Sequence, residues 1–357
     1  MDFSIVLFSA LNQGLMWGLV AIGVYFSFRV LDFADMTCEG SLVIGGAITA
    51  ITFQAGLPPV LAIPFSLLCG AVAGLITGVL HTKLRIPPIL SGILTMTALY
   101  SINLLIMDGA MVSISNTDTL TTGLTEALMG TGMNGRYGPR LSEFLIFFMV
   151  VAVVVGIIYW FFGTEFGCTI RATGMNPKMC RAQGINTNTT IIVGLMISNA
   201  LIALAGCLMV HQKSNVNADM GKGALVIGLA SIIIGEAMTG KKFPFWAKLI
   251  MLIVGSMIYC FVEQLILLIP GFNPDIFKLI VAIMVTLVLA IPAIKNGSGP
   301  LMQKLFGKKD KHEEMALATE GGSVIVPGEA VEESVEVVED TIEAEENLKE
   351  DGENVGN

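Results

Sequence analysis

Two carboxylates beside an apolar run are the first candidates for chemistry. Asp35 and Glu39 lie four residues apart in the stretch Asp35–Gly45, DMTCEGSLVIG, and Glu39 is expected about one turn into a helix. Acidic groups are costly at membrane depth, so they tend to face cavities and to act on ions or substrates. Glu39 could therefore meet the ammonium group of a substrate. Alternatively, it is an interfacial carboxylate paired with Arg29 or Arg85.

Motifs for enzymatic chemistry fail on inspection. Gly235–Lys242, GEAMTGKK, nearly matches a phosphate-binding P-loop, but a Ser or Thr must follow the Lys to bind magnesium, and Lys242 stands there. His81, His211 and His312 are far apart in sequence, and no H-E-x-x-H or G-x-S-x-G pattern occurs. The cysteines show no CxxC spacing. We therefore expect a protein that is not an enzyme and that holds no metal or cofactor of its own.

A polar, basic stretch, Thr164–Asn188, lies between two long apolar runs and carries the signals of a short helix. Asn176 can cap the helix, Pro177 suits its first position, and Gly184 can end it in a left-handed conformation. These signals predict about two turns of helix, roughly 10 Å long, which is unstable alone in water. We expect this helix to dock against a partner. The cations of the stretch are Arg171, Lys178 and Arg181.

The rest of the chain is unusually apolar. Of its 357 residues, 54% are hydrophobic and 14% are charged, and apolar runs long enough to cross a bilayer recur. The sequence predicts an all-α, polytopic helical membrane protein. The second and seventh segments are short and glycine-rich, so either is a candidate for a broken or re-entrant helix. The expected segments are 5–28, 36–54, 58–81, 87–107, 141–163, 190–211, 223–239, 247–269 and 276–294.

Lys and Arg set the expected orientation, because they concentrate on the cytoplasmic side of membrane proteins. If the Thr164–Asn188 loop is cytoplasmic, alternation of the segments leaves few cations outside, namely Arg136, Arg140, Lys213 and Lys222. This bias predicts an external N-terminus and a cytoplasmic C-terminus.

Two segments outside the spans differ in character. Asp108–Arg140 is rich in Thr, Ser, Asn and Gly, and it is either a docking surface for a delivery protein or a solvated loop. After Asn296 the chain becomes acidic: from Asp310 onward it holds 16 acidic and 2 basic residues, roughly −14, against −9 for the whole chain. The composition predicts a disordered cytoplasmic tail over 296–357.

An internal repeat organises the apolar part. Asp35–Gly45 (DMTCEGSLVIG) and Asp219–Gly228 (DMGKGALVIG) match with one gap, and each opens a short glycine-rich segment. The repeats, about 1–107 and 190–294, are separated by an odd number of crossings and are therefore inverted, with a substrate route expected between them. The alternative is chance matching of apolar strings. Candidate residues of the route are Asp35, Glu39, Gly45 and Gly228.

The central loop and its flanks resemble the membrane subunits of ATP-binding-cassette importers, in particular the branched-chain amino-acid permeases and their ribose-type relatives. The resemblance rests on IRATGMNPKMCRAQGINTN followed by ALAG at Ala203–Gly206, on DFADMTCEGSLVIGGAITA, and on GKGALVIGLASIIIGEAM. It covers roughly residues 5–295. The long acidic tail departs from the endings that are common in that family.

The resemblance implies a permease domain over 1–295 in the plasma (inner) membrane of a bacterium. In that family a cytoplasmic coupling helix, here Met175–Ile185 within the loop 164–189, seats in a groove of a separate ATPase, which binds the ATP. Further implied partners are an extracytoplasmic solute-binding protein and a second permease chain, identical or not, but no nucleic acid. The residues expected to couple to the ATPase are Arg171, Gly174, Met175, Asn176, Pro177, Lys178, Arg181 and Gly184, with Arg171 and Arg181 facing acidic or backbone groups of the ATPase.

The transported solute is expected to be an amino acid, because the membrane segments offer few of the amide and aromatic groups of a sugar route. A sugar or nucleoside permease is the nearest alternative. A stand-alone secondary transporter that uses protonation of Asp35 or Glu39 is another, although such a carrier has no use for a docking helix. A membrane scaffold whose acidic tail recruits partners is the third.

Overall fold

The computed structural model describes residues 3–114, 120, 138–239 and 244–267. The chain divides into the units Met1–Pro292 and Ala293–Asn357, and every described residue belongs to the first. The predicted ninth segment, the acidic tail and most of the segment 108–140, which was predicted to be external, therefore lie outside the described residues.

The described part is helical, as the sequence predicts, and eight of the nine expected segments lie in it as helices. The π-helix η1 (Phe26–Val30) continues α1, and a short turn of 3-10 helix, η2 (Pro59–Leu61), leads into α3. Six helices, with these extensions, are long and apolar enough to cross a membrane. The helices are α1 (Phe3–Tyr25), α2 (Thr37–Gln54), α3 (Ala62–Thr82), α4 (Pro88–Met107), α6 (Gly138–Phe162), α7 (Glu165–Met175), α8 (Pro177–Ala182), α9 (Thr187–Lys213), α10 (Ala224–Met238) and α11 (Phe245–Leu267).

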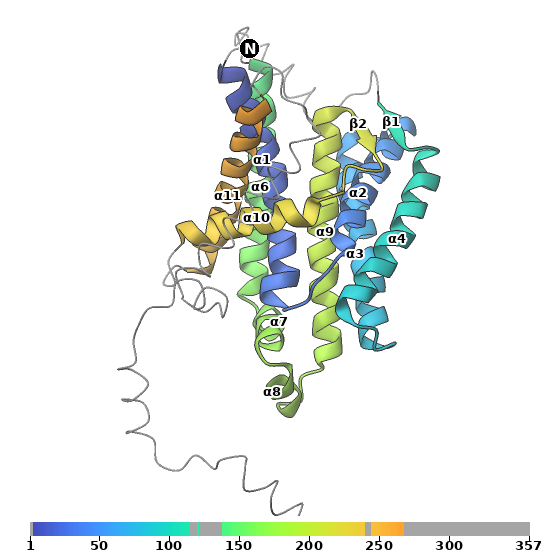
Figure 1. The fold of residues 1–357 in the computed structure, drawn as a ribbon, viewed down its shortest axis with the longest axis vertical. Helices are drawn as coiled ribbons and strands as arrows, with labels where there is room; N and C mark the ends of the chain where they lie inside the picture. Colours follow the sequence, from blue (N-terminus) through green and yellow to red (C-terminus); the bar gives the residue numbers. More distant parts are fainter. Residues whose placement is uncertain (1–2, 115–119, 121–137, 240–243, 268–357) are drawn as a thin grey trace, which may run out of the picture. The chain divides into compact units, whose positions relative to one another are not determined.

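The two helices expected to be incomplete spans, α2 and α10, are not among those six. The 15 residues of α10 rise only about 22 Å, less than the roughly 30 Å of a bilayer core. In Figure 1, α2 begins level with the middle of α9 and runs from there toward the β-strands, while α10 crosses the bundle at that same level. Both helices therefore begin in the interior of the bundle.

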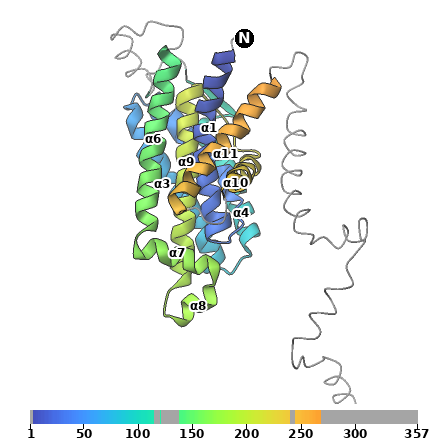
Figure 2. The ribbon, with the colours of Figure 1, turned by 90° about the vertical axis from the view of Figure 1, so that its left-hand side faces the viewer.

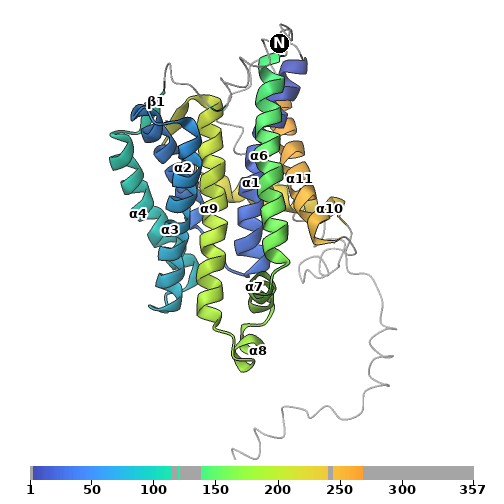
Figure 3. The same cartoon turned by 180° about the vertical axis from the view of Figure 1, so that it is seen from behind.

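The helices pack in two groups around α1 and α9. The predicted repeat would relate α1 to α9, α2 to α10 and α3 to α11. In the structure, α9 packs on α2 and α3, α1 packs on α10 and α11, and α1 and α9 pack on each other. Figure 3 shows α2, α3 and α4 on one side of α9 and α1, α6 and α11 on the other, and Figure 2 shows α7 and α8 together at one end of the bundle.

Small residues allow the closest helix contacts. A Cβ on Gly45 of α2 would clash with the carbonyl oxygen of Ala203 in α9, and one on Gly206 of α9 would clash with the carbonyl oxygen of Leu42. In the other repeat, a Cβ on Gly228 would lie 3.0 Å from the side chain of Val24 in α1. Gly45 and Gly228, which occupy equivalent positions of the repeat, thus each face the first helix of the opposite half.

A short antiparallel pair of strands, β1 (Met111–Ser113) and β2 (Asn215–Asn217), joins the segments that follow α4 and α9. The sequence did not predict it, because three residues in each strand are too few to show an alternating pattern. The strands lie at the end of the bundle opposite α8 (Figure 1).

We expect Gly45→Val to destabilise the protein by about 1–3 kcal/mol, because the added side chain separates α2 from α9. The measurement is the thermal unfolding midpoint in detergent. Gly156→Ala is the matched control, since no atom lies within 4 Å of a Cβ at Gly156. Equal midpoints for the two variants would show that the α2–α9 contact is not as close as described.

Candidate functional site

The loop between α6 and α9 forms two consecutive short helices. The Thr164 side chain accepts a hydrogen bond from the Gly167 amide (3.3 Å) at the start of α7, and the Asn176 side chain accepts one from the Met179 amide (3.0 Å) at the start of α8. Pro177 is the first residue of α8, and Gly184 beyond its end has a φ of +81°. The predicted cap, first residue and left-handed glycine are thus all confirmed.

The helix α7 was not predicted as a helix of its own. The signal was present: Thr164 caps the helix, Glu165 favours its first turn, and Gly167, Ile170 and Thr173 recur every three residues as its buried face. A one-sided pattern of this kind is typical of a helix that lies on a surface.

The helices α7 and α8 are held against the C-terminal end of α1 and the N-terminal end of α9. A Cβ on Gly174 would clash with the carbonyl oxygen of Val30 in η1, so α7 lies directly against the end of α1. The buried hydroxyl of Thr190 in α9 donates to the hydroxyl of Thr173 (3.0 Å). Cys180 of α8 is fully buried. The loop is therefore fixed to both halves of the bundle.

The far side of the pair presents methionines. Met175, the last residue of α7, and Met179, in α8, are 87% and 45% exposed, and Lys178 of α8 is also exposed. Large exposed apolar side chains on a small surface are typical of a docking site, and methionine adapts readily to a partner. The predicted coupling helix, Met175–Ile185, contains both methionines, although only Met175 is among the residues individually expected to couple to the ATPase.

The structure places the two arginines of the loop apart. Arg171 lies over the ring of Phe245 at the start of α11, with its guanidinium carbon 5.6 Å from the ring centroid. The Arg181 Nε atom instead donates to the Thr187 hydroxyl (2.7 Å). Arg171 and Arg181 therefore belong to different surfaces of the loop.

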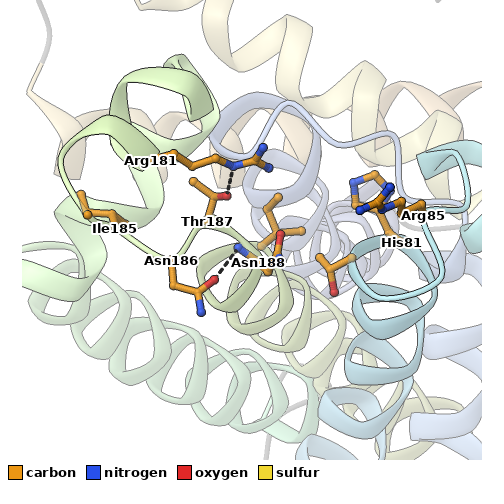
Figure 4. Close-up of a pocket in the computed structure, with 10 residues that line it drawn as sticks. His81, Arg85, Arg181, Ile185, Asn186, Thr187 and Asn188 are labelled. Carbon is orange, nitrogen blue, oxygen red and sulfur yellow. Dashed lines mark hydrogen bonds between the residues drawn. The ribbon is translucent and has the colours of Figure 1, made fainter.

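Arg181 lines a basic cavity of about 710 Å³ between the α3–α4 turn and the start of α9 (Figure 4). His81, in the last turn of α3, and Arg85, in the α3–α4 turn, line the cavity, and His81 Nδ1 lies 2.8 Å from the Ile86 carbonyl oxygen. The Asn186 side chain accepts from the Asn188 amide (3.1 Å) at the rim. The cavity gathers cations from two loops that are distant in sequence.

Asp35 is a structural carboxylate. It is fully buried, its Oδ1 accepts from the Thr37 amide (2.8 Å) at the start of α2, and its Oδ2 accepts from the Asn199 side chain (2.7 Å) in α9. Asn199 in turn accepts from the Ser41 hydroxyl (2.6 Å). Gly45 and Gly228 are also packed between helices. Of the four residues predicted to line the substrate route, Glu39 is the one that lines a cavity of the described part.

The partner of Glu39 is a backbone group. Its Oε1 accepts a hydrogen bond from the Gly223 amide (3.0 Å), immediately before α10. Arg29, one of the two partners considered for Glu39, instead pairs with Glu236 (3.0 Å). Glu39 therefore links the start of α2 to the start of α10.

The cavity beside Glu39 measures about 420 Å³ and is lined from α2, α4 and the loop before α10. Lys222 enters it with its Nζ atom 2.7 Å from Asp219 and 6.0 Å from the ring centroid of Tyr100. The ion pair with Asp219 favours the charged form of Lys222. The cavity thus brings together a carboxylate, an ammonium group and an aromatic ring.

Comparisons with known proteins agree on one family. The family described as branched-chain amino acid transport system / permease component matches residues 6–289. No solved structure matches the chain.

Three named relatives differ in what they transport. The chain is 37% identical to the tyrosine transport system permease protein of Clostridioides difficile, over 85% of this chain and 98% of the relative. It is 29% identical to a probable branched-chain amino acid transport permease of Methanocaldococcus jannaschii, over 61% of this chain and 69% of the relative. The galactofuranose transporter permease of Escherichia coli is 26% identical, over 79% of this chain and 77% of the relative.

The family match covers nearly all of the apolar part of the chain, including the central loop and both glycine-rich segments. The chain therefore belongs to the permease family of branched-chain amino-acid and ribose-type ATP-binding-cassette importers.

Proposed function

We propose that this chain is the transmembrane permease subunit of an ATP-driven importer for an amino acid, coupled through α7 and α8 to a separate ATPase. The observation that carries the proposal is the exposed Met175–Met179 surface on a helix pair that is itself held firmly by the bundle. A partner that binds this surface could move α7 and α8 together as a rigid unit.

The contacts of the loop explain how a force applied there would spread. Because α7 lies against Val30 and its Thr173 bonds to Thr190, a displacement of α7 and α8 acts on α1 and α9 together. These are the first helices of the two repeats, and α9 holds α2 through Asn199 and Asp35. The loop is thus linked by packed groups to the interior of the bundle.

An amino acid is the proposed solute. The tyrosine transport permease, which is similar to this chain over nearly its whole length, supports this class. A sugar is the alternative, since ribose and galactofuranose permeases are also similar to the chain at lower identity.

The assembly proposed is that of two permease chains, an ATPase that binds ATP, and an extracytoplasmic solute-binding protein in a bacterial plasma membrane. The loop 164–189 and the C-terminus are then cytoplasmic, and the N-terminus is external. In support, α8 and the β1–β2 pair lie at opposite ends of the bundle (Figure 1).

A secondary transporter driven by protonation of Asp35 is less favoured. Both carboxylate oxygens of Asp35 accept hydrogen bonds, and its side chain lines no cavity among the described residues. Asp35 therefore has a packing role that accounts for its position without proton transfer.

We expect Met175→Glu with Met179→Glu to lower the amount of ATPase that co-purifies with the permease about tenfold, because a docking surface depends on a few apolar anchors. The measurement is affinity purification from native membranes followed by quantification of the bound ATPase. Met111→Glu is the matched control, since Met111 is 59% exposed and lies in β1 at the opposite end. ATPase recovery equal to wild type in the double variant would contradict the proposed docking surface.

We expect a cysteine placed at Met175 to be labelled from the cytoplasm and not from outside intact cells. Met175 is a better reporter than Cys180, which is fully buried, and Cys168 must first be replaced because it is exposed. A cysteine at Met111 should show the opposite accessibility. Labelling of Met175→Cys by an impermeant reagent outside intact cells would overturn the coupling role of the loop.

A further inference from the structure

The 420 Å³ cavity lies where the two repeats begin their interrupted helices. Glu39 precedes Gly40 in one copy of the repeat, and Lys222 precedes Gly223 in the other, so the two charged residues occupy equivalent positions. The loop before α10 presses on α2 so closely that a Cβ on Gly221 would clash with the Glu39 carbonyl oxygen. Two opposite charges are therefore brought to one cavity by the internal symmetry of the chain.

These charges lie deep in the bundle but are not sealed from its surface. Both α2 and α10 begin level with the middle of α9 (Figure 1), yet the Lys222 side chain is 60% exposed and Glu39 is half-buried. A charged group at that depth is strongly disfavoured against lipid. The cavity must therefore open onto a water-filled space or onto another protein chain.

A third group in the cavity lacks a full set of partners. Asn103 of α4 is fully buried and donates to the Gly40 carbonyl oxygen (3.3 Å), but its Oδ1 atom has no hydrogen-bond partner among the described residues. A buried polar atom without a partner is destabilising, so such atoms call for an explanation. A ligand that donates a hydrogen bond within the cavity provides one.

We propose that this cavity binds the transported amino acid as a zwitterion, with Glu39 and Asn103 receiving the α-ammonium group and Lys222 the α-carboxylate. The assignment rests on the proposed function and names the site where the solute is held in the membrane.

The surrounding groups fit such a ligand. Val43 and Met96 supply apolar lining, and the Tyr100 ring, 42% exposed at the rim, supplies an aromatic face for a side chain. Lys222 forms an ion pair with the Asp219 carboxylate. Binding of a substrate carboxylate would replace this ion pair with another of the same kind. A neutral sugar brings no opposite charge to Glu39 or Lys222, so it would gain no charge-assisted contact with either group.

The experiment uses the permease purified with its ATPase and binding protein from native membranes and reconstituted in liposomes. ATP-driven uptake is measured for labelled L-tyrosine, L-leucine and D-ribose. The variants are Glu39→Gln, which keeps an acceptor for the Gly223 amide, and Lys222→Met and Lys222→Arg, whose exposed side chain leaves the packing intact. Asp108→Asn, an exposed acid-to-amide change at the outer end of α4, is the matched control.

We expect wild type and Asp108→Asn to take up at least one of the two amino acids and not ribose. Glu39→Gln and Lys222→Met should each lower that uptake about tenfold, since each loses a charge-assisted contact. Lys222→Arg should retain most of it, and all variants should bind the ATPase normally. These last two results separate solute recognition from loss of folding or assembly.

Two other outcomes would count against different claims. Amino-acid uptake that is undiminished in both Glu39→Gln and Lys222→Met would overturn the zwitterion site and leave the proposed importer standing. ATP-driven uptake of ribose by the wild type, with neither amino acid transported, would overturn the proposed substrate class and the zwitterion site with it.

Discussion

Helices that begin inside a membrane protein need acceptors for their first amide groups, and this need shapes the centre of the bundle. Lipid cannot supply those acceptors at the start of α2 or α10. A carboxylate supplies one in each case: Asp35 accepts from the Thr37 amide (2.8 Å) and Glu39 accepts from the Gly223 amide (3.0 Å). Because Glu39 belongs to one repeat and Gly223 to the other, the same interaction also joins the two halves.

The close contacts around α9 make this arrangement stiff. Gly206 meets the Leu42 backbone and Gly45 meets the Ala203 backbone, so α2 cannot slide along α9 without a clash. Asp35 and Asn199 tie the two helices together at the lower end of α2. A force applied to the loop 164–189 at the end of α9 would therefore reach the start of α2 while deforming the intervening contacts little, as rigid-body motion requires.

The sequence predicted the features that depend on neighbouring residues and did not predict the contacts between residues that are distant in the chain. The cap at Asn176, the first turn at Pro177 and the left-handed Gly184 are set by neighbouring residues, and all three are confirmed. The partners of Arg171 and Arg181 come from α11 and α9, and spacing along the chain carries no information about them. The short spans α2 and α10 were predictable because their glycines and lengths are local features.

The same distinction explains why Glu39 and Asp35 looked alike in sequence and differ in the structure. Both acids lie beside the start of α2, but Asn199 of α9 covers Asp35, whereas the loop before α10 brings Lys222 to the side of Glu39. An internal repeat can predict which residues become equivalent, but it does not predict that equivalent positions hold opposite charges in one cavity. That juxtaposition arises because the crossing of α2 and α10 near the middle of α9 brings the two repeat signatures together, and it is what would allow a nearly symmetric framework to hold an asymmetric, dipolar ligand.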